Sequence, residues 1–345
     1  MNHRSSLLVA FLLSSVSTGV AQTLSFKVAG VNRSAIVHAP SGLDRPALVL
    51  LLHGLGGNGA DMQSSTQMDK VADREKFVAV YPNAVGGTWD YAGAKNDYAF
   101  FKAIIDTAVS RYGVDRERVY VTGFSQGGGE AVYAAFSYPD VFAAVAPVSS
   151  VGSGAPTPKR PVPILLTFGT KDLYTPATFM SSVASWVKID SCKGNPVVVR
   201  PYPATNSRSV VTRITWGDCA QGTRIVVDSI QGGGHEWPNN TSTKVNNAEE
   251  VWAFFKQFTL TRTGNVGVGL RSAPDRPFAA FFRSGTVFLV GADRNCRIEI
   301  RNLDGRIAAT ATASDGQFAL PLPSGIYTVR LADPGRSRIA GLVVP

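Results

Sequence analysis

The chain has 345 residues, of which 44% are hydrophobic and 17% charged, and its formal net charge is +9. This balance supplies enough apolar side chains for a sizeable core, and it excludes both a disordered chain and a coiled coil. The length exceeds that of most single domains, so we expect one large domain and one small one.

The first 21 residues have the pattern of an export signal. His3 and Arg4 form a basic start, the apolar run Leu7–Leu13 is too short to span a bilayer, and Gly19–Ala21 supplies small residues for cleavage before Gln22. No later stretch approaches about eighteen uninterrupted apolar residues, so we expect no membrane span in the mature chain. The sequence therefore predicts a secreted bacterial protein, extracellular or on the cell surface.

Residues 22–260 alternate between apolar strands and helix-length segments. The expected strands are Leu24–Ala29, Ser34–Ala39, Ala47–Leu52, Phe77–Tyr81, Arg118–Thr122, Phe142–Val148, Pro163–Phe168, Val197–Pro201, Val210–Trp216 and Thr223–Ile230. The expected helices are Asp97–Tyr112, Glu130–Ser137, Phe179–Ile189 and Asn247–Phe258. Such alternation predicts an α/β domain whose mostly parallel sheet is covered by helices on both faces.

The composition changes near residue 260. Residues 22–260 carry 11 Lys and 11 Arg against 19 acidic residues, whereas residues 261–345 carry 11 Arg and no Lys against 6 acidic residues. We expect a linker over 261–283, rich in Gly, Arg, Pro and Ser, and a small all-β sandwich over 284–345. The expected strands there are Thr286–Val290, Arg297–Asn302, Arg306–Thr312, Gln317–Leu320, Ile326–Leu331 and Ile339–Val344. Because the arginines are scattered without interleaved aromatic residues, we expect no nucleic-acid partner.

Export makes the three cysteines informative, since an oxidising compartment permits disulfides. Cys192 and Cys219 lie in the same predicted domain, on either side of a strand pair, and are the expected bridge. Cys296 is left over in the tail, where we expect a buried free thiol. The cysteines and histidines do not have zinc-site spacing, so no metal or cofactor is expected.

The stretch Gly123–Gly127, with sequence GFSQG, follows a predicted strand and precedes a predicted helix. In this context small flanking glycines allow a turn so sharp that the hydroxyl of Ser125 projects above the sheet edge. The alternative is a chance occurrence of the pattern in a glycine-rich chain. We interpret Ser125 as a catalytic nucleophile.

A serine nucleophile needs a base that titrates near neutral pH, and histidine is the usual one. His38 alternates on an early strand and is interpreted as structural. His53 ends the strand 47–52 and is expected to hold the following loop by hydrogen bonding. His235 lies in a glycine-rich loop ahead of the last helix and is the expected base, with a surface-loop histidine as the alternative.

The third catalytic group must orient the imidazole and stabilise its charged form. Asp172 closes a turn directly after the apolar strand 163–168, so its carboxylate is expected on the same rim of the sheet as Ser125. Asp190 and Asp218 are rivals, but they flank the cysteines instead of ending a core strand. The chain order serine, aspartate, histidine is the order found in α/β-hydrolases.

Two further groups of residues complete the predicted site. The glycine-rich loop after His53 is expected to supply an oxyanion donor, so we assign the backbone N–H groups of Leu55 and Gln126 to that hole. Trp89 and Trp237 lie in loops and are interpreted as substrate-binding residues that form an aromatic wall; packing within the loops is the alternative.

Residues 24–260 resemble carbohydrate esterase family 1, the family of feruloyl and acetylxylan esterases, and the related polyhydroxybutyrate depolymerases. The stretches that carry the resemblance are Leu51–Gly57, Tyr112–Val121, Gly123–Gly128, Gly169–Asp172 and Gly232–Pro238. The spacing of Cys192, Trp216 and Cys219 also matches. One departure is the pair Gly129-Glu130, where relatives often carry apolar residues such as Met; Glu130 could alter packing or polarity near the acyl site.

The resemblance implies a secreted serine esterase with Ser125, Asp172 and His235 as its triad, acting on feruloyl or acetyl groups of xylan in plant cell walls. A polyhydroxyalkanoate depolymerase is the alternative, and a non-catalytic surface-binding protein is a second one. The expected partners are polysaccharide or polyester substrates. The tail resembles the C-terminal sorting domains of type IX-secreted proteins, which implies contact with secretion machinery or the cell surface.

Overall fold

The computed structural model describes residues 21–91, 96–239 and 244–260, followed by 279–283, 286–290, 297–302, 307–312, 317–319, 325–333 and 336–344. The chain divides into two compact units, Met1–Gly267 and Val268–Pro345. The predicted signal peptide lies outside the described residues except for Ala21, as do most of the predicted linker and Cys296.

The first unit is built on a sheet of ten strands in the order β1-β2-β4-β3-β5-β6-β7-β10-β9-β8. The six strands from β4 to β10 in that order run parallel, while β1, β2, β9 and β8 pair antiparallel at the two edges. Their bounds are β1 Ala21–Val28, β2 Val31–His38, β3 Leu48–Leu52, β4 Val78–Pro82, β5 Val119–Phe124, β6 Ala144–Val148, β7 Ile164–Gly169, β8 Val197–Val199, β9 Val211–Trp216 and β10 Ile225–Ile230.

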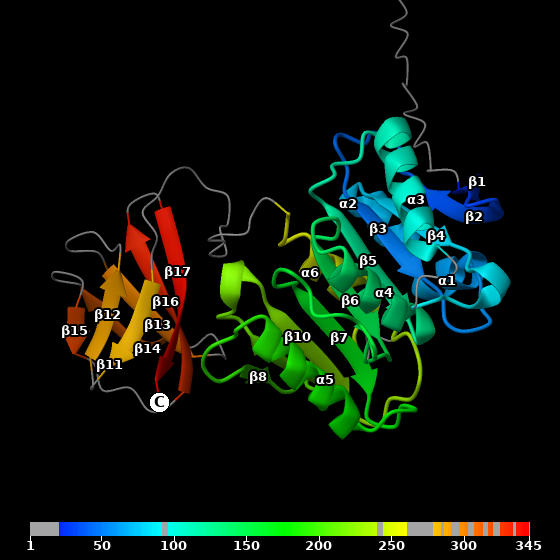
Figure 1. Cartoon of the computed structure of the whole chain (residues 1–345). Coiled ribbons are helices and arrows are strands. Elements are labelled where there is room, and N and C mark those ends of the chain that lie inside the picture. The colour runs from blue at the N-terminus through cyan, green and yellow to red at the C-terminus, as the bar shows by residue number, and fades with distance from the viewer. Residues whose placement is uncertain are drawn as a thin grey trace, which may run out of the picture. The chain divides into compact units, whose positions relative to one another are not determined.

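Helices cover both faces of this sheet, as the strand–helix alternation predicted (Figure 1). Helices α3, α4 and α5 pack on one face, and α1, α2 and α6 pack on the other. Their bounds are α1 Gly59–Thr66, α2 Met68–Glu75, α3 Asp97–Tyr112, α4 Gln126–Ser137, α5 Pro176–Ile189 and α6 Asn247–Phe255. The α/β class is therefore confirmed.

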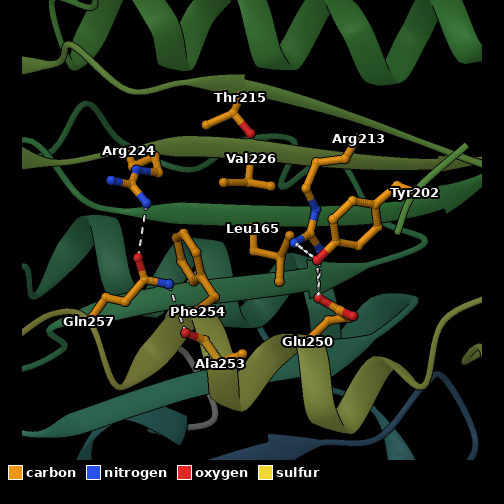
Figure 2. A pocket seen from close by; sticks show the side chains of 10 residues that line it. All are labelled: Leu165, Tyr202, Arg213, Thr215, Arg224, Val226, Glu250, Ala253, Phe254 and Gln257. Atoms are coloured by element: carbon orange, nitrogen blue, oxygen red, sulfur yellow. Dashed lines mark hydrogen bonds and ion pairs between the residues drawn. The ribbon is translucent and has the colours of Figure 1, made fainter. Parts of the chain in front are cut away.

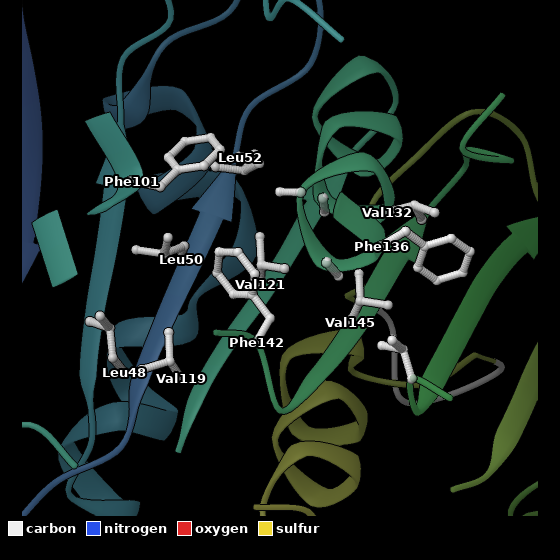
Figure 3. Packing of buried hydrophobic residues seen from close by; sticks show 14 of the residues in the cluster. Leu48, Leu50, Leu52, Phe101, Val119, Val121, Val132, Phe136, Phe142 and Val145 are labelled. Carbon is white, nitrogen blue, oxygen red and sulfur yellow. The ribbon is translucent and has the colours of Figure 1, made fainter. Parts of the chain in front are cut away.

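The core explains why the central strands are continuous apolar runs. All five residues of β3 are buried. Successive side chains of a strand point to opposite faces, and Leu48, Leu50 and Leu52 enter one hydrophobic cluster while Val49 and Leu51 enter the other. Figure 3 shows the first cluster, in which these leucines pack with side chains of the neighbouring strands and helices. Burying each such side chain contributes about 1.5–3 kcal/mol.

Two differences from the sequence prediction concern helices near the site. The first is that α1 and α2 were not predicted; α1 buries only Gly59, Met62 and Thr66, so its apolar periodicity is weak. The second is that α4 begins at Gln126, four residues before the predicted start at Glu130. We read the three glycines between these positions as a turn, but the backbone of α4 starts directly after Ser125 and uses them for close packing.

The second unit contains two antiparallel sheets, in the orders β11-β12-β15 and β14-β13-β16-β17. The strands are β11 Ala279–Arg283, β12 Thr286–Val290, β13 Arg297–Asn302, β14 Ile307–Thr312, β15 Gln317–Ala319, β16 Gly325–Asp333 and β17 Arg336–Val344. The linker predicted over 261–283 is wrong in its last five residues. The run AAFFR at 279–283 is apolar enough to form β11, which pairs with β12.

The structure also bears on the predicted disulfide and on the prediction about membrane spans. Cys192 and Cys219 form a disulfide, as predicted. Among the described residues, no helix is both long enough and apolar enough to cross a membrane.

Candidate active site

Ser125 lies between the end of β5 and the first residue of α4, in a backbone conformation that side-chain-bearing residues rarely adopt (φ 54°, ψ −120°). Such strain costs about 1–3 kcal/mol and persists only where the surroundings enforce it. Here the two flanking glycines do so. A Cβ on Gly123 would lie 2.3 Å from the carbonyl oxygen of Gly127, and a Cβ on Gly127 would lie 2.2 Å from that of Leu52.

Asp172 and His235 meet in a hydrogen-bonded pair. The Nδ1 of His235 lies 2.6 Å from the Oδ1 of Asp172, and because an ionised carboxylate can only accept, the ring donates from Nδ1. This leaves Nε2 as the nitrogen that can take a proton. The Asp172 side chain is fully buried, whereas His235 is 22% exposed. The His235 ring packs against Phe124, the residue before Ser125, with 4.8 Å between ring centroids.

The turn that carries the aspartate and the loop that carries the histidine are joined through their backbones. The N–H of Lys171 donates to the carbonyl of Gly233 at 2.8 Å. The two backbones also approach closely at Gly169. Any side chain there would clash, because its Cβ would lie 2.2 Å from the carbonyl oxygen of Gly233. The turn with Asp172 and the loop with His235 are therefore bonded to each other, and they follow the neighbouring parallel strands β7 and β10. This shared backbone support holds the two side chains together.

His53 uses both of its ring nitrogens to hold the loop after β3. Its Nε2 accepts from the N–H of Ala84 at 3.1 Å, so Nδ1 carries the proton and donates to the carbonyl of Gly54 at 2.8 Å. Burial lowers the pKa of this imidazole. With both nitrogens engaged and the neutral form favoured, His53 is suited to hold the loop, and it has no nitrogen left to act as a base.

The loop that His53 holds passes beside the serine. A Cβ on Gly54 would lie 3.5 Å from the Cβ of Ser125. Among the described residues, the N–H groups of Leu55 and Gln126 have no protein acceptor. Gln126 is itself held, since its carbonyl accepts from the Tyr91 hydroxyl at 2.8 Å. These are the two donors that the sequence assigned to an oxyanion hole.

Trp89 does not line a wall for substrate. It is 2% exposed and packs with Phe101 and His53. Its indole N–H donates to the carbonyl of His53 at 2.8 Å, and its backbone N–H donates to the side-chain oxygen of Gln126 at 3.1 Å. The ring is thus part of the core, and its contacts tie the loop around residue 89 to both predicted oxyanion segments.

Trp237 is half-buried and packs against the cluster under α6. Its indole nitrogen is buried and has no hydrogen-bond partner among the described residues. Part of the Trp237 ring is exposed to solvent, two residues after His235 in the chain. The role of Trp237 as a substrate-binding residue stays a prediction.

The sequence reasoning missed a group of exposed apolar side chains next to these residues. Leu173 directly follows Asp172 and is 76% exposed, and Tyr174 is 46% exposed. Leu55, whose N–H is a predicted oxyanion donor, is 68% exposed. One feature of the sequence could have indicated these exposed side chains. The apolar residues lie inside turns, where no following strand or helix could bury them.

Glu130 lies one helical turn beyond Ser125 and is almost fully buried. Burial raises the pKa of its carboxyl to about 9, with Asp97 and Asp90 adding to the shift and Arg33 opposing it. Its Oε2 has no hydrogen-bond partner among the described residues. The same carboxyl also raises the pKa of the nearby Tyr91 hydroxyl, second to burial. The carboxyl is therefore a neutral acid at pH 7.

Within the described part of the chain, no cluster of histidine, cysteine, aspartate and glutamate could hold a metal ion. The residues described above offer a hydroxyl, an imidazole oriented by a carboxylate, and two backbone N–H donors. A mostly parallel sheet with a strand–serine–helix turn, an aspartate after β7 and a histidine after β10 is the arrangement of an α/β-hydrolase.

Comparison with known proteins shows which α/β-hydrolases this chain is similar to. Residues 33–157 match the model of the family described as "Esterase PHB depolymerase". A bifunctional acetylxylan esterase/xylanase from Neocallimastix patriciarum is 33% identical over 256 residues, which cover 69% of this chain and 36% of that protein. Feruloyl esterase B from Piromyces equi is 29% identical over 260 residues, covering 66% of this chain and 46% of that protein. The chain thus spans less than half the length of these two relatives.

Among solved structures, an acetyl xylan esterase from Aspergillus awamori superposes with a TM-score of 0.54 at 18% identity, covering 68% of this chain and 99% of that one. This likeness shows that the fold is shared. The α/β unit is thus similar in sequence to the esterase and depolymerase family over residues 33–157 and to an acetylxylan esterase/xylanase and a feruloyl esterase over about two thirds of the chain. The resemblance of residues 284–345 to a sorting domain is not tested by these matches and stays a prediction.

Proposed function

We propose that this protein is a secreted serine esterase that hydrolyses feruloyl or acetyl esters on xylan, with Ser125, Asp172 and His235 as its catalytic residues. The observation that carries the proposal is the hydrogen bond between His235 Nδ1 and Asp172, beside a strained turn that presents a serine. The similarity to the esterase and depolymerase family and to an acetylxylan esterase/xylanase supports the same reaction class.

In the proposed reaction the hydroxyl oxygen of Ser125 attacks the ester carbonyl carbon while its proton passes to Nε2 of His235. The N–H groups of Leu55 and Gln126 donate to the resulting oxyanion, and each such donor typically lowers the barrier by about 3 kcal/mol. The tetrahedral intermediate expels the alcohol, which takes the proton from His235. Water then attacks the acyl-enzyme through the same base, and the carboxylic acid leaves.

Hydrolysis of 4-nitrophenyl acetate tests the reaction class. Replacing Ser125 with Ala should abolish turnover, while Ser185→Ala, an exposed serine on α5, serves as the matched control. Substantial activity in the Ser125→Ala variant would remove the serine from the mechanism. A wild-type chain that is folded yet inactive would instead favour the non-catalytic binding protein.

Polyester hydrolysis is the second candidate, and it is favoured by the exposed side chains of Leu55, Leu173 and Tyr174 around the site. An apolar rim of this kind suits a flat, water-insoluble polymer better than a hydrated polysaccharide. Rates on methyl ferulate, acetylated xylan and polyhydroxybutyrate would separate the candidates. The xylan proposal expects the first two to be the better substrates.

The secreted location and the role of the tail belong to the same proposal. The predicted signal over residues 1–21 and the Cys192–Cys219 disulfide support export to an oxidising compartment. We assign residues 284–345 to sorting or attachment, because the proposed catalytic residues all lie within the first unit. Truncation after Thr261 should preserve turnover on 4-nitrophenyl acetate and change where the protein accumulates or how it adheres to insoluble substrate.

A further inference from the structure

A cavity lies on the face of the sheet that α6 covers. Its volume is about 270 Å³, and α6, β7, β9 and β10 line it together with flanking loops. Figure 2 shows the side chains that line the cavity: Leu165, Val226 and Phe254 lie between two groups of polar side chains. None of the proposed catalytic residues lines it. Leu165 and Val226 sit near the starts of β7 and β10, whereas Asp172 and His235 follow the ends of those strands.

One end of the cavity carries a cation without an anion. Arg224 is half-buried, and among the described residues no carboxylate lies within salt-bridge distance of it. Its Nη1 donates to the side-chain oxygen of Gln257 at 2.9 Å. Burial lowers the pKa of the guanidinium, and no neighbouring carboxylate opposes that shift. A guanidinium has five N–H donors in a planar fork that fits a carboxylate, so this end is suited to bind one.

The opposite end is rich in acceptors. Arg213 lies between two carboxylates there: its Nε donates to Asp228 at 2.6 Å and its Nη2 donates to the Oε2 of Glu250 at 2.9 Å. The Tyr202 hydroxyl donates to the same Oε2 at 3.0 Å. Glu250 lines the cavity, and both of these contacts fall on its Oε2. One guanidinium and two carboxylates at this end would repel a second anion and attract a hydroxyl or ammonium donor.

The space between the two ends is lined by hydrocarbon side chains and by Thr215 (Figure 2). Leu165, Val226 and Phe254 supply hydrocarbon surface there. A volume of about 270 Å³ equals the liquid volume of about nine water molecules. The hydrophobic middle favours a ligand with an aromatic or aliphatic body over a chain of waters.

We propose that this cavity is a binding site for a small hydroxycarboxylic acid, whose carboxylate pairs with Arg224 and whose distal hydroxyl donates to Glu250. The charges at the two ends fix the orientation of the ligand, and the apolar middle selects for its body. This proposal does not rest on the proposed esterase activity, since the two sites share no residue.

The test uses 4-hydroxycinnamate as the probe and measures its binding to the full chain by isothermal titration calorimetry. Replacing Arg224 with Met keeps the aliphatic stem and removes the charge, so affinity should fall about 10- to 100-fold, the range for losing a charged hydrogen bond. Arg224→Gln should weaken binding in the same direction. Neither variant should change turnover of 4-nitrophenyl acetate, which also verifies that each is folded.

Two analogues and one further variant locate the probe. 4-Hydroxycinnamamide, which lacks the carboxylate, and cinnamate, which lacks the hydroxyl, should both bind more weakly than 4-hydroxycinnamate to the wild type. His235→Ala should leave the affinity unchanged. The proposal is overturned if the Arg224 variants bind normally, if His235→Ala alone abolishes binding, or if the wild type shows no binding with a Kd of about 1 mM or tighter.

Discussion

Two loops of the α/β unit each carry a histidine at the end of a parallel strand, and the structure treats them in opposite ways. His53, after β3, has both ring nitrogens hydrogen-bonded within the protein and is 2% exposed. His235, after β10, has one nitrogen bonded to a buried carboxylate and its ring is 22% exposed. The difference teaches that an imidazole whose two nitrogens are both held by backbone groups serves to fix a loop, whereas one held by a carboxylate at Nδ1 can still exchange a proton at Nε2.

The largest expected effect comes from removing His235, the proposed base. His235→Ala should lower turnover of 4-nitrophenyl acetate about a million-fold, because losing the base of a triad costs nearly as much as losing the whole triad. His38→Asn is the control: His38 is hydrogen-bonded to Asp73, at 2.8 Å, and should be dispensable for turnover. Equal losses in both variants would point to a folding defect and contradict a specific role for His235.

The second prediction concerns the carboxylate that distinguishes the two histidines. Asp172→Asn should reduce turnover about 10⁴-fold, because the amide cannot hold the imidazole in the tautomer that leaves Nε2 free to accept a proton. The comparison variant is Asp106→Asn, which removes an exposed carboxylate on α3 and should leave turnover unchanged. Wild-type turnover in Asp172→Asn would mean that the hydrogen bond in the structure serves only to hold the loop.

The third prediction targets the histidine that holds its loop. His53→Ala should lower turnover about 10²- to 10³-fold, the cost of misplacing one oxyanion donor, here the N–H of Leu55. The pH dependence of kcat/KM should keep the same acidic limb, since the base is unchanged. If that limb disappears in His53→Ala and persists in His235→Ala, the roles of the two histidines are reversed.

The smallest expected effect is a change in stability and concerns Glu130. Its carboxyl is buried, and its Oε2 has no hydrogen-bond partner among the described residues. Its pKa is about 9 in the folded chain against a usual value of 4.5, so between these values the folded state keeps a proton that the unfolded state loses. The free energy of unfolding should therefore fall by about 1.4 kcal/mol per pH unit from this group as pH rises through that window.

Glu130→Gln removes the titration while keeping the shape of the side chain. Urea denaturation at several pH values between 5 and 8 should show a shallower decline of stability in this variant than in the wild type. Glu249→Gln, an exposed position on α6, provides the control and should follow the wild type. Parallel pH profiles for Glu130→Gln and the wild type would show that the carboxyl is ionised in the folded protein.

The strands and the site residues could be predicted from sequence for a common physical reason. Strands buried on both faces, such as β3 and β4, must be continuous apolar runs. A polar residue immediately after such a run has to lie at the rim of the sheet, which is how Asp172 was recognised. The serine followed from the same logic, because glycines at 123 and 127 are required wherever the chain turns that sharply.

Features that depend on contacts between distant segments could not be predicted in this way. Trp89 lies in a loop, and nothing local indicates that Phe101, on α3, and the His53 loop would enclose it. The cavity beside α6 has the same origin: Arg224 and Glu250 come from different elements that only the folded sheet brings together. The sequence predicts the start of α4 at Glu130 because glycine disfavours a helix interior, whereas in the structure the absence of side chains at 127–129 permits close packing.

The shared support under Asp172 and His235 has a consequence for thermal motion. The backbone bond from Lys171 to Gly233 and the close approach at Gly169 couple the two segments, so a displacement of one carries the other with it. Ser125 stands on a different support, between β5 and α4. The hydroxyl and the imidazole are coupled more weakly, through the packing of the His235 ring on Phe124, so warming the protein should disturb their alignment before it separates the imidazole from its carboxylate. Loss of activity should then precede any change in the imidazole's tautomer.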